Sequence, residues 1–174
     1  MTSVFLSLGS NIEPEKNILE AVRLLAEQVR ILGTSTVYLT KPLHRRTQPK
    51  YFNCVLKVET GIPPLRLKFD VLRGIEERLG RKRIEDKYAS RTIDIDIIVY
   101  GDLHLSSKDL VIPDPKIKRR AFLAIPLCEI EPRLVLPATK RTMKEVASRF
   151  NVHSMIRQEN FTETLLDLVR TLSM

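Results

Sequence analysis

Residues 91–97, with the sequence RTIDIDI, place two carboxylates two positions apart, at Asp94 and Asp96. Residues two apart in a β-strand point to the same face, so both carboxylates emerge together while the isoleucines beside them face the opposite side. Two anions this close repel each other unless a cation joins them, and Mg²⁺ is usually held by one or two carboxylates, water and substrate phosphates. The pair therefore predicts a magnesium site.

The alternative interpretation of this pair is a solvated strand surface, on which the carboxylates pair with nearby Arg and Lys side chains. Two features favour the metal site. Aspartate is depleted in β-strands, so two in one strand need a reason other than strand formation. Strongly basic segments also flank the pair in sequence, at 81–91 and 114–120.

The positive charge of the chain is a second clue to its chemistry. The 174 residues include 29 Lys and Arg against 21 Asp and Glu, for a formal net charge of +8. The excess is concentrated in three short segments, 44–50, 81–91 and 114–120. A basic balance implies an anionic partner, which can be a nucleic acid, a phosphorylated small molecule or an acidic membrane surface.

The basic segment 81–91 (RKRIEDKYASR) runs directly into the aspartate strand. Arginine binds phosphate oxygens in a bidentate manner and offsets the charge that develops during phosphoryl transfer, so a cationic loop beside a magnesium site suits a polyphosphate substrate. A solvated loop is the alternative. The sequence has no G-x-x-x-x-G-K-[ST] run, which argues against a P-loop, so side chains and metal must hold the phosphates.

A third candidate segment is 48–53 (QPKYFN), in which Tyr51 and Asn53 share one face of a predicted strand. An aromatic ring with an amide two residues away can stack on a flat heterocycle and read its polar edge. The alternative is ordinary strand surface. The spacing of the cysteines and histidines predicts no zinc site.

The order of the predicted elements determines how these segments can meet. Apolar alternation predicts strands over 3–9, 34–40, 51–60 and 92–100, and apolar residues at the helical period predict helices over 14–31 and 63–79. This β-α-β-β-α-β order is typical of a ferredoxin-like α+β fold, an antiparallel sheet with helices on one face. A hairpin formed by 103–105 and 110–112 and helices over 119–129, 142–150 and 161–172 are expected to follow.

Length and composition predict a single domain over 1–150, followed by a C-terminal helical extension over 151–174 of unknown role. No uncharged apolar stretch approaches the ~18–20 residues that cross a bilayer, so we expect no membrane span. The two cysteines lie far apart, and the first ten residues lack the pattern of a secretory signal. We therefore expect reduced thiols and a cytoplasmic protein.

Together the motifs resemble those of the 6-hydroxymethyl-7,8-dihydropterin pyrophosphokinase family of folate biosynthesis. The resemblance runs from about residue 4 to residue 137, and it rests on the order and spacing of 8–11 (LGSN), 48–53 (QPKYFN), 91–97 (RTIDIDI), 112–115 (IPDP) and 120–127 (RAFLAIPL). The family has a ferredoxin-like α+β fold, in agreement with the predicted order of elements. The resemblance implies a magnesium-dependent transfer of diphosphate from ATP to the hydroxymethyl group of a reduced pterin, with release of AMP.

The resemblance also implies roles for individual residues. Two Mg²⁺ ions that bridge the ATP phosphates would be held by Asp94 and Asp96. The implied catalytic arginines, which neutralise phosphate charge, are Arg81, Arg83 and Arg91. The residues implied for ATP binding are Arg81, Arg83, Tyr88, Arg91 and Arg120. The residues implied for pterin binding are Thr40, Leu43, Tyr51, Asn53 and Phe122, with Tyr51 and Phe122 as the two rings that sandwich the pterin.

The implied chemistry is mostly positioning and electrostatics. The hydroxyl group attacks the β-phosphorus in line while metal and arginine stabilise the spreading charge. The implied partners are small molecules, ATP as co-substrate and a reduced pterin, with no nucleic acid and no membrane. The protein is expected to act as a monomer.

The sequence departs from the family pattern at three places. Tyr88, Ala89 and Ser90 stand where the family commonly has Trp-Gly-Pro, which keeps an aromatic ring but loses a stiff turn. Asp114 replaces the histidine of a Pro-His-Pro segment and places an anion at an implied ATP contact. The segment 45–46 (RR) replaces a stretch rich in glycine and proline and adds charge near the pocket.

Two other functions fit parts of the sequence. A nucleic-acid module on a ferredoxin-like sheet would suit the basic loops, but a carboxylate pair would repel phosphate and the K/R-G-F/Y signature is missing. A family member that binds pterin or nucleotide without catalysis is the other alternative. Retention of both aspartates and of three arginines argues against that alternative.

Overall fold

The computed structural model describes residues 1–44, 47–137 and 139–174, so the departure at 45–46 lies outside the described residues. Its strands are β1 (Thr2–Ser10), β2 (Arg30–Thr34), β3 (Tyr38–Thr40), β4 (Tyr51–Thr60), β5 (Asp94–Tyr100), β6 (Leu105–Ser106), β7 (Val111–Ile112) and β8 (Ile156–Arg157). Its α-helices are α1 (Pro14–Ala26), α2 (Pro64–Arg66), α3 (Arg73–Arg78), α4 (Ala121–Ile130), α5 (Met143–Ala147) and α6 (Glu159–Leu172). A π-helical segment, η1 (Leu67–Leu72), joins α2 to α3, and short 3₁₀ helices occupy Pro115–Lys118 (η2) and Val152–Ser154 (η3).

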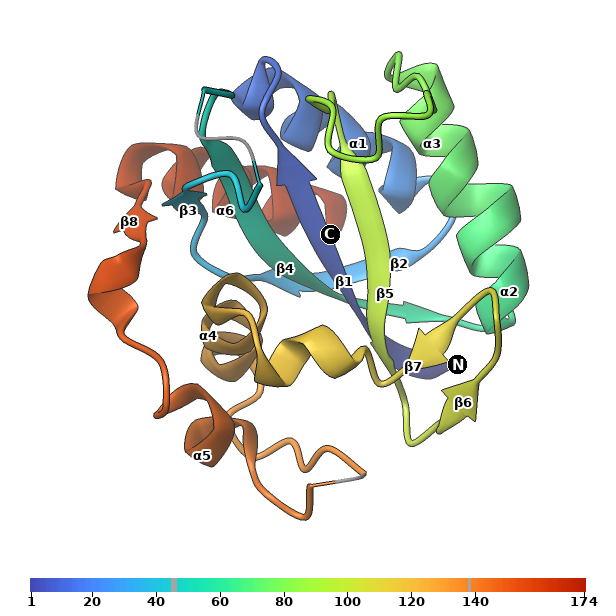
Figure 1. Ribbon diagram of the computed structural model, residues 1–174. Coiled ribbons are helices and arrows are strands. Elements are labelled where there is room, and N and C mark those ends of the chain that lie inside the picture. Colours follow the sequence, from blue (N-terminus) through green and yellow to red (C-terminus); the bar gives the residue numbers. More distant parts are fainter. Residues whose placement is uncertain (45–46, 138) are drawn as a thin grey trace.

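Over the described residues, the main sheet has six strands: five in the order β5-β1-β4-β3-β8, and β2, which also pairs with β4 (Figure 1). These pairings are antiparallel. From β1 to β5 the elements follow the predicted β-α-β-β-α-β order, with β2 and β3 together in the place of one strand, so the predicted ferredoxin-like α+β fold is confirmed. The predicted hairpin is also present as β6 and β7, which form a separate two-stranded sheet.

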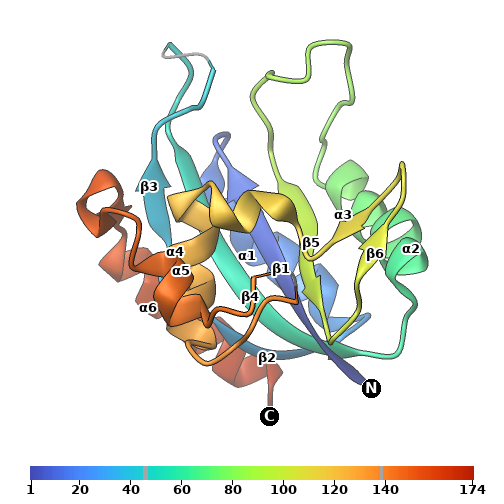
Figure 2. The ribbon, with the colours of Figure 1, turned by 60° about the horizontal axis from the view of Figure 1, so that its bottom comes forward.

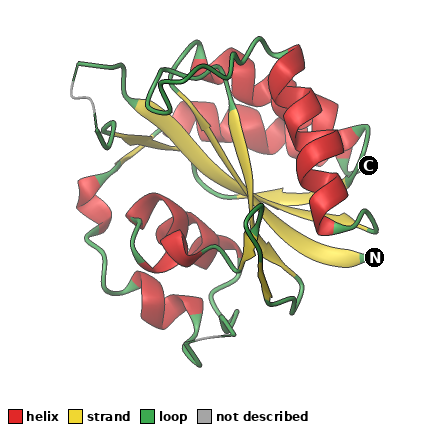
Figure 3. Cartoon of the chain, turned by 45° about the vertical axis from the view of Figure 1, so that its right-hand side comes forward, coloured by secondary structure: helices red, strands yellow, loops and turns green. Residues whose placement is uncertain are grey.

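Helices cover both faces of the sheet (Figure 3). One apolar cluster joins Leu6 and Leu8 of β1 to residues of α1, η1, α3 and α6. A second cluster joins Phe5 of β1 and Val55 of β4 to residues of α4 and α5. The expected placement of helices on one face therefore holds for α1 and α3, whereas α4 and α5 lie on the opposite face.

Several predicted elements have different bounds in the structure, most of all the helix over 14–31 and the strand over 34–40. Helix α1 ends at Ala26 rather than near residue 31, because the alternation of buried Val29 and Ile31 with exposed Arg30 suits a strand as well as a helix. The strand predicted over 34–40 is interrupted, since Thr34 is the last residue of β2 and Tyr38–Thr40 form β3. At the break, the side-chain oxygen of Ser35 accepts the N–H of Val55 at 2.9 Å in place of a backbone carbonyl, which interrupts the ladder.

The segment after residue 151 packs into the same folded unit as the rest of the chain. Strand β8 pairs with β3 at the edge of the sheet, and the N–H of Gln158 donates to the carbonyl of Val37 at 2.8 Å. On α6, Phe161 and Leu165 are buried in the first apolar cluster. Within the described ranges, neither α6 nor any other helix is long and apolar enough to span a bilayer.

Candidate active site

A cavity of about 470 Å³ opens at one end of the sheet. The described parts of the β3–β4 and α3–β5 connections extend beyond that end (Figure 2). The cavity is lined by the following residues that the sequence singled out for a site: Thr40, Leu43, Tyr51, Asn53, Tyr88, Arg91, Asp94, Asp96, Arg120 and Phe122. The structure thus brings the aspartate pair and the aromatic and amide side chains to one cavity.

Strands β5, β1 and β4 form the floor of this cavity, and their register determines which residues lie side by side there. Gly9 of β1 lies opposite Asp94 on one side and opposite Asn53 on the other, and Ser7 lies opposite Asp96. A Cβ atom on Gly9 would lie 2.9 Å from the Oδ1 of Asn53. Glycine at this position therefore keeps the floor open between the aspartates and the Asn53 amide.

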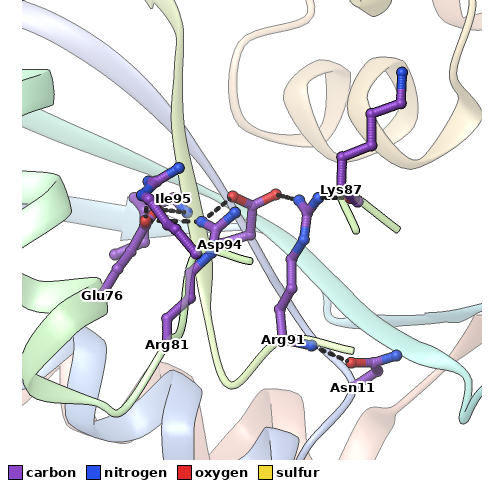
Figure 4. Close-up of polar contacts among 8 residues, drawn as sticks. Asn11, Glu76, Arg81, Lys87, Arg91, Asp94 and Ile95 are labelled. Carbon is purple, nitrogen blue, oxygen red and sulfur yellow. Dashed lines mark hydrogen bonds and ion pairs between the residues drawn. The ribbon is translucent and has the colours of Figure 1, made fainter. Parts of the chain in front are cut away.

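Both carboxylate oxygens of Asp94 accept hydrogen bonds from arginines. Its Oδ1 lies 2.7 Å from Nη1 of Arg81, and its Oδ2 lies 2.7 Å from Nη1 of Arg91 (Figure 4). The two arginines approach the carboxylate from opposite sides. This geometry holds the Asp94 side chain at a fixed place beside the cavity.

Asp96 is exposed at the cavity, yet the protein packed around its carboxylate raises its pKa to about 7 by partial desolvation; the charge of Asp94 adds to the shift, and the ammonium group of Lys116 opposes it. Among the described residues, no side chain donates a hydrogen bond to Asp96. Two adjacent carboxylates, one with an unfavourable negative charge, are a donor set that suits Mg²⁺.

The described residues contain no group of three or more His, Cys, Asp or Glu side chains suited to a metal ion. A divalent cation at Asp94 and Asp96 would therefore complete its coordination with water or with oxygens of a ligand. This arrangement is the usual one for Mg²⁺ at nucleotide sites, where substrate phosphates supply part of the coordination.

Arg81 and Arg83 contact a residue that the sequence did not indicate, Glu76 of α3. Oε2 of Glu76 lies 2.7 Å from Nη1 of Arg81 and 2.7 Å from Nη2 of Arg83, and Oε1 accepts the N–H of Ile95 at 3.0 Å. Neither arginine is among the residues that line the cavity. Burial raises the pKa of Glu76, and the N–H of Ile95 and the two guanidinium groups oppose this rise.

A signal for Glu76 was present in the sequence. Glu76 follows Leu72 by four residues and precedes Leu79 by three, so it lies on the apolar stripe of this helix. A buried carboxylate needs cationic partners. Arg81 and Arg83, which follow shortly after the end of this helix, could supply them.

Asn11 lies next to the cavity without lining it, and the sequence did not single it out for a role. Its Nδ2 lies 3.3 Å from the carbonyl of Pro49 and 3.3 Å from Oγ of Ser90. The side chain thus contacts both loops that border the cavity. Its place directly after the first strand, in the LGSN segment, was the available signal.

The same cavity also carries groups suited to a flat heterocycle. Nδ2 of Asn53 donates to Oγ1 of Thr40 at 2.6 Å, which fixes the amide and leaves its Oδ1 over Gly9. Tyr51 is partly buried, and burial raises the pKa of its phenol. Phe122 reaches the same cavity from α4. An amide acceptor and two aromatic rings thus line the same cavity.

The two described departures from the family pattern also lie at this cavity. Asp114 lines it, but its Oδ1 accepts the N–H of Lys116 at 2.9 Å and caps η2. Tyr88 makes a tilted ring contact with His44, with centroids 4.3 Å apart. The carbonyl of Tyr88 accepts a hydrogen bond from Nε2 of Gln48 at 2.6 Å. The two loops therefore touch each other at the mouth of the cavity.

Comparison with known sequences gives matches over most of the chain. Residues 5–132 match the family described as 7,8-dihydro-6-hydroxymethylpterin-pyrophosphokinase. The chain is 35% identical over 160 residues to the 2-amino-4-hydroxy-6-hydroxymethyldihydropteridine pyrophosphokinase of Haemophilus influenzae, covering 90% of this chain and 98% of that protein. The Aquifex aeolicus protein of the same name is 37% identical over 146 residues, covering 83% of this chain and 90% of its own length.

Other matches are to parts of longer proteins. The chain is 40% identical over 139 residues to the folic acid synthesis protein fol1 of Pneumocystis carinii, covering 79% of this chain but only 18% of that protein. Among solved structures, Plasmodium falciparum HPPK-DHPS superposes with a TM-score of 0.69 at 15% identity, covering 85% of this chain and 44% of that one. This structural likeness supports the fold.

Proposed function

The chain belongs to the 7,8-dihydro-6-hydroxymethylpterin-pyrophosphokinase family, and we propose that it transfers diphosphate from ATP to the hydroxymethyl group of 6-hydroxymethyl-7,8-dihydropterin. The products are AMP and the pterin diphosphate, and the step belongs to folate biosynthesis. The observation that carries this proposal is that one cavity is lined both by the Asp94–Asp96 pair and by Tyr51, Asn53 and Phe122. A carboxylate pair suits a metal-bound polyphosphate, and the rings and amide suit a pterin.

Magnesium is the cofactor that we propose for this site, with Asp94 and Asp96 as its protein ligands. The sequence resemblance implies two ions. Bound Mg²⁺ would neutralise the ATP phosphates and the charge that spreads over them during transfer. The raised pKa of Asp96 supports the assignment, because a cation beside it would compensate a charge that this site otherwise disfavours.

The chain's own cations are proposed to hold the ATP phosphates. Arg91 and Arg120 line the cavity, and so does Lys116. Their positive charge faces the region where a triphosphate would lie beside the aspartates. Tyr88 lines the same cavity, and we propose that its ring, at the mouth, contacts the nucleotide.

The pterin is proposed to lie between the rings of Tyr51 and Phe122. Asn53 would accept an N–H of the heterocycle at Oδ1, because one N–H of its Nδ2 donates to Oγ1 of Thr40 and holds the amide in this orientation. Leu43, which is 54% exposed at the loop, would cover the outer edge. With both substrates held in one cavity, the hydroxyl group can attack the β-phosphorus in line, and the catalytic contribution is orientation together with charge stabilisation.

We also propose that the enzyme acts as a cytoplasmic monomer whose partners are these two small molecules rather than nucleic acid or membrane. The substrates support the cytoplasm, since both are soluble metabolites. The cavity supports a monomer, since one chain supplies every residue assigned to it above. Size-exclusion chromatography with light scattering tests the oligomeric state.

A direct assay tests the proposed reaction. Purified protein is incubated with ATP, Mg²⁺ and 6-hydroxymethyl-7,8-dihydropterin, and AMP and the pterin diphosphate are quantified by chromatography. We expect stoichiometric formation of both products, and none without the pterin. Absence of AMP with every divalent cation tested would contradict the proposal.

A further inference from the structure

Glu76 lies behind the edge strand β5 and is 3% exposed. Among the described residues, β5 pairs in the main sheet with β1 alone, so N–H groups on its other side need partners outside the sheet. One of these is the N–H of Ile95, the residue between the two aspartates, and Oε1 of Glu76 accepts it at 3.0 Å. Glu76 therefore fixes the strand at the point where both carboxylates emerge.

The second oxygen of Glu76 contacts two arginines of very different exposure. Nη1 of Arg81 lies 2.7 Å from Oε2 of Glu76 and also 2.7 Å from Oδ1 of Asp94, and the Arg81 side chain is 11% exposed. Arg83 lies 2.7 Å from the same Oε2, but its side chain is 48% exposed. Arg81 is thus enclosed between two carboxylates, whereas Arg83 is held by one ion pair next to solvent.

We propose that Glu76 is a positioning residue that holds Arg81 against Asp94 and keeps Arg83 out of the cavity until the polyphosphate of the substrate competes for it. The inference rests on the proposed function, because the polyphosphate is that of ATP. Arg83 can leave Glu76 without exposing an uncompensated buried charge, since Arg81 remains beside that carboxylate. The phosphates offer Arg83 several strong acceptors in exchange for a single carboxylate oxygen.

Substitution of Glu76 by glutamine separates the effect of its negative charge from the effect of its shape. A glutamine at this position retains a side-chain oxygen that accepts the N–H of Ile95, so β5 keeps its anchor. It loses the negative charge that attracts Arg81 and Arg83. Glu77, the next residue of α3, is exposed and offers the same change of charge without these contacts.

The test compares Glu76→Gln with Glu77→Gln. A non-hydrolysable ATP analogue is titrated by calorimetry in the presence of Mg²⁺ without pterin, and kcat and KM are measured by AMP formation. We expect Glu76→Gln to bind the analogue about threefold more tightly, because Arg83 is released, while kcat falls about tenfold, because Arg81 and Asp94 lose their fixed positions. Glu77→Gln should change neither value.

A purely structural role for Glu76 gives a different result. It predicts that affinity and kcat fall together with the melting temperature, and that outcome, or an affinity equal to that of the parent chain, overturns the proposal. The double variant Glu76→Gln/Arg83→Gln should lose the gain in affinity, since Arg83 is its source; a retained gain also overturns the proposal.

Arg83→Gln alone decides the matter if Glu76→Gln does not fold. We expect it to weaken binding of the analogue about threefold at an unchanged melting temperature, because its side chain is half-exposed and would lose a phosphate contact. Unchanged affinity contradicts the inference. A parent chain that binds the analogue but forms no AMP contradicts the proposed function instead, and the affinity comparison still tests Glu76.

Discussion

Asn11 and Arg91, 80 residues apart in sequence, hold each other through two hydrogen bonds. The N–H of Asn11 donates to the carbonyl of Arg91 at 3.1 Å, and the N–H of Arg91 donates to Oδ1 of Asn11 at 2.8 Å. The first bond uses the backbone of Asn11, but the second depends on its side chain. That side chain therefore places Arg91, whose guanidinium group binds Asp94, at the edge of the cavity.

Asn11→Ala should loosen both loops around the cavity. The variant loses a buried set of side-chain hydrogen bonds, so we expect a loss of about 1–2 kcal/mol in the free energy of unfolding. We also expect kcat/KM for ATP to fall about tenfold, since Arg91 is no longer fixed. Urea unfolding and the AMP assay give the two values. Asn160→Ala, at an exposed position of α6, is the control, and an Asn11→Ala enzyme with the parent kcat/KM contradicts the role.

Gly9→Ala tests whether the floor of the cavity must stay open. The added Cβ would lie 2.9 Å from Oδ1 of Asn53, so the amide proposed to bind the pterin has to move. We expect the pterin Kd to rise at least about tenfold while the Kd of the ATP analogue stays within about twofold. Gly33→Ala is the matched control, because no neighbouring atom of the described ranges lies within 4 Å of a Cβ added at Gly33. Equal pterin affinity in the two variants would count against the proposed pterin site.

Asp96→Asn should change how stability depends on pH. The raised pKa of Asp96, about 7, means that the folded protein resists ionisation of this group more than the unfolded chain does. The stability associated with Asp96 is therefore fully present below the pKa of the unfolded chain, near 3.8, and is lost as pH rises through about 7. Without metal, we expect the asparagine variant to melt at a higher temperature than the parent chain above pH 7, with the difference shrinking toward pH 4.

Metal addition provides the second half of this test. Mg²⁺ that binds the ionised pair should raise the melting temperature of the parent chain above pH 7 and have little effect on Asp96→Asn. Asp102→Asn, at an exposed turn position, serves as the control for loss of one carboxylate. Parallel melting curves for the parent chain and Asp96→Asn across this pH range, with and without Mg²⁺, would contradict the proposed ligand role.

Local patterns in the sequence predicted much of the fold and of the cavity. Alternation placed Asp94 and Asp96 on one face of a strand, and the structure shows that both line the cavity. The same rule placed Tyr51 and Asn53 together. These predictions succeeded because a strand imposes its two-residue period whatever lies next to it.

The parts that the sequence did not predict depend on neighbours from distant segments. The role of Glu76 follows from its contact with the N–H of Ile95, which needs the packing of α3 behind β5. The division of the strand predicted over 34–40 depends on Ser35 bonding to β4. The addition of β8 to the sheet depends on an edge left open by β3, which no pattern within 151–174 reveals.

Leu165→Ala tests whether the C-terminal extension belongs to the same cooperative unit as the cavity. Leu165 of α6 is 0% exposed and packs in the cluster that contains Leu6 and Leu8 of β1. The smaller alanine side chain leaves a void in that cluster. We therefore expect the free energy of unfolding to fall by about 2–5 kcal/mol, with a single unfolding transition. Leu172→Ala, on the same helix but 36% exposed, should change stability by no more than about 0.5 kcal/mol. If the extension folded separately from residues 1–150, Leu165→Ala would leave the main transition in place, because the sheet and the cavity would not need α6 for their packing.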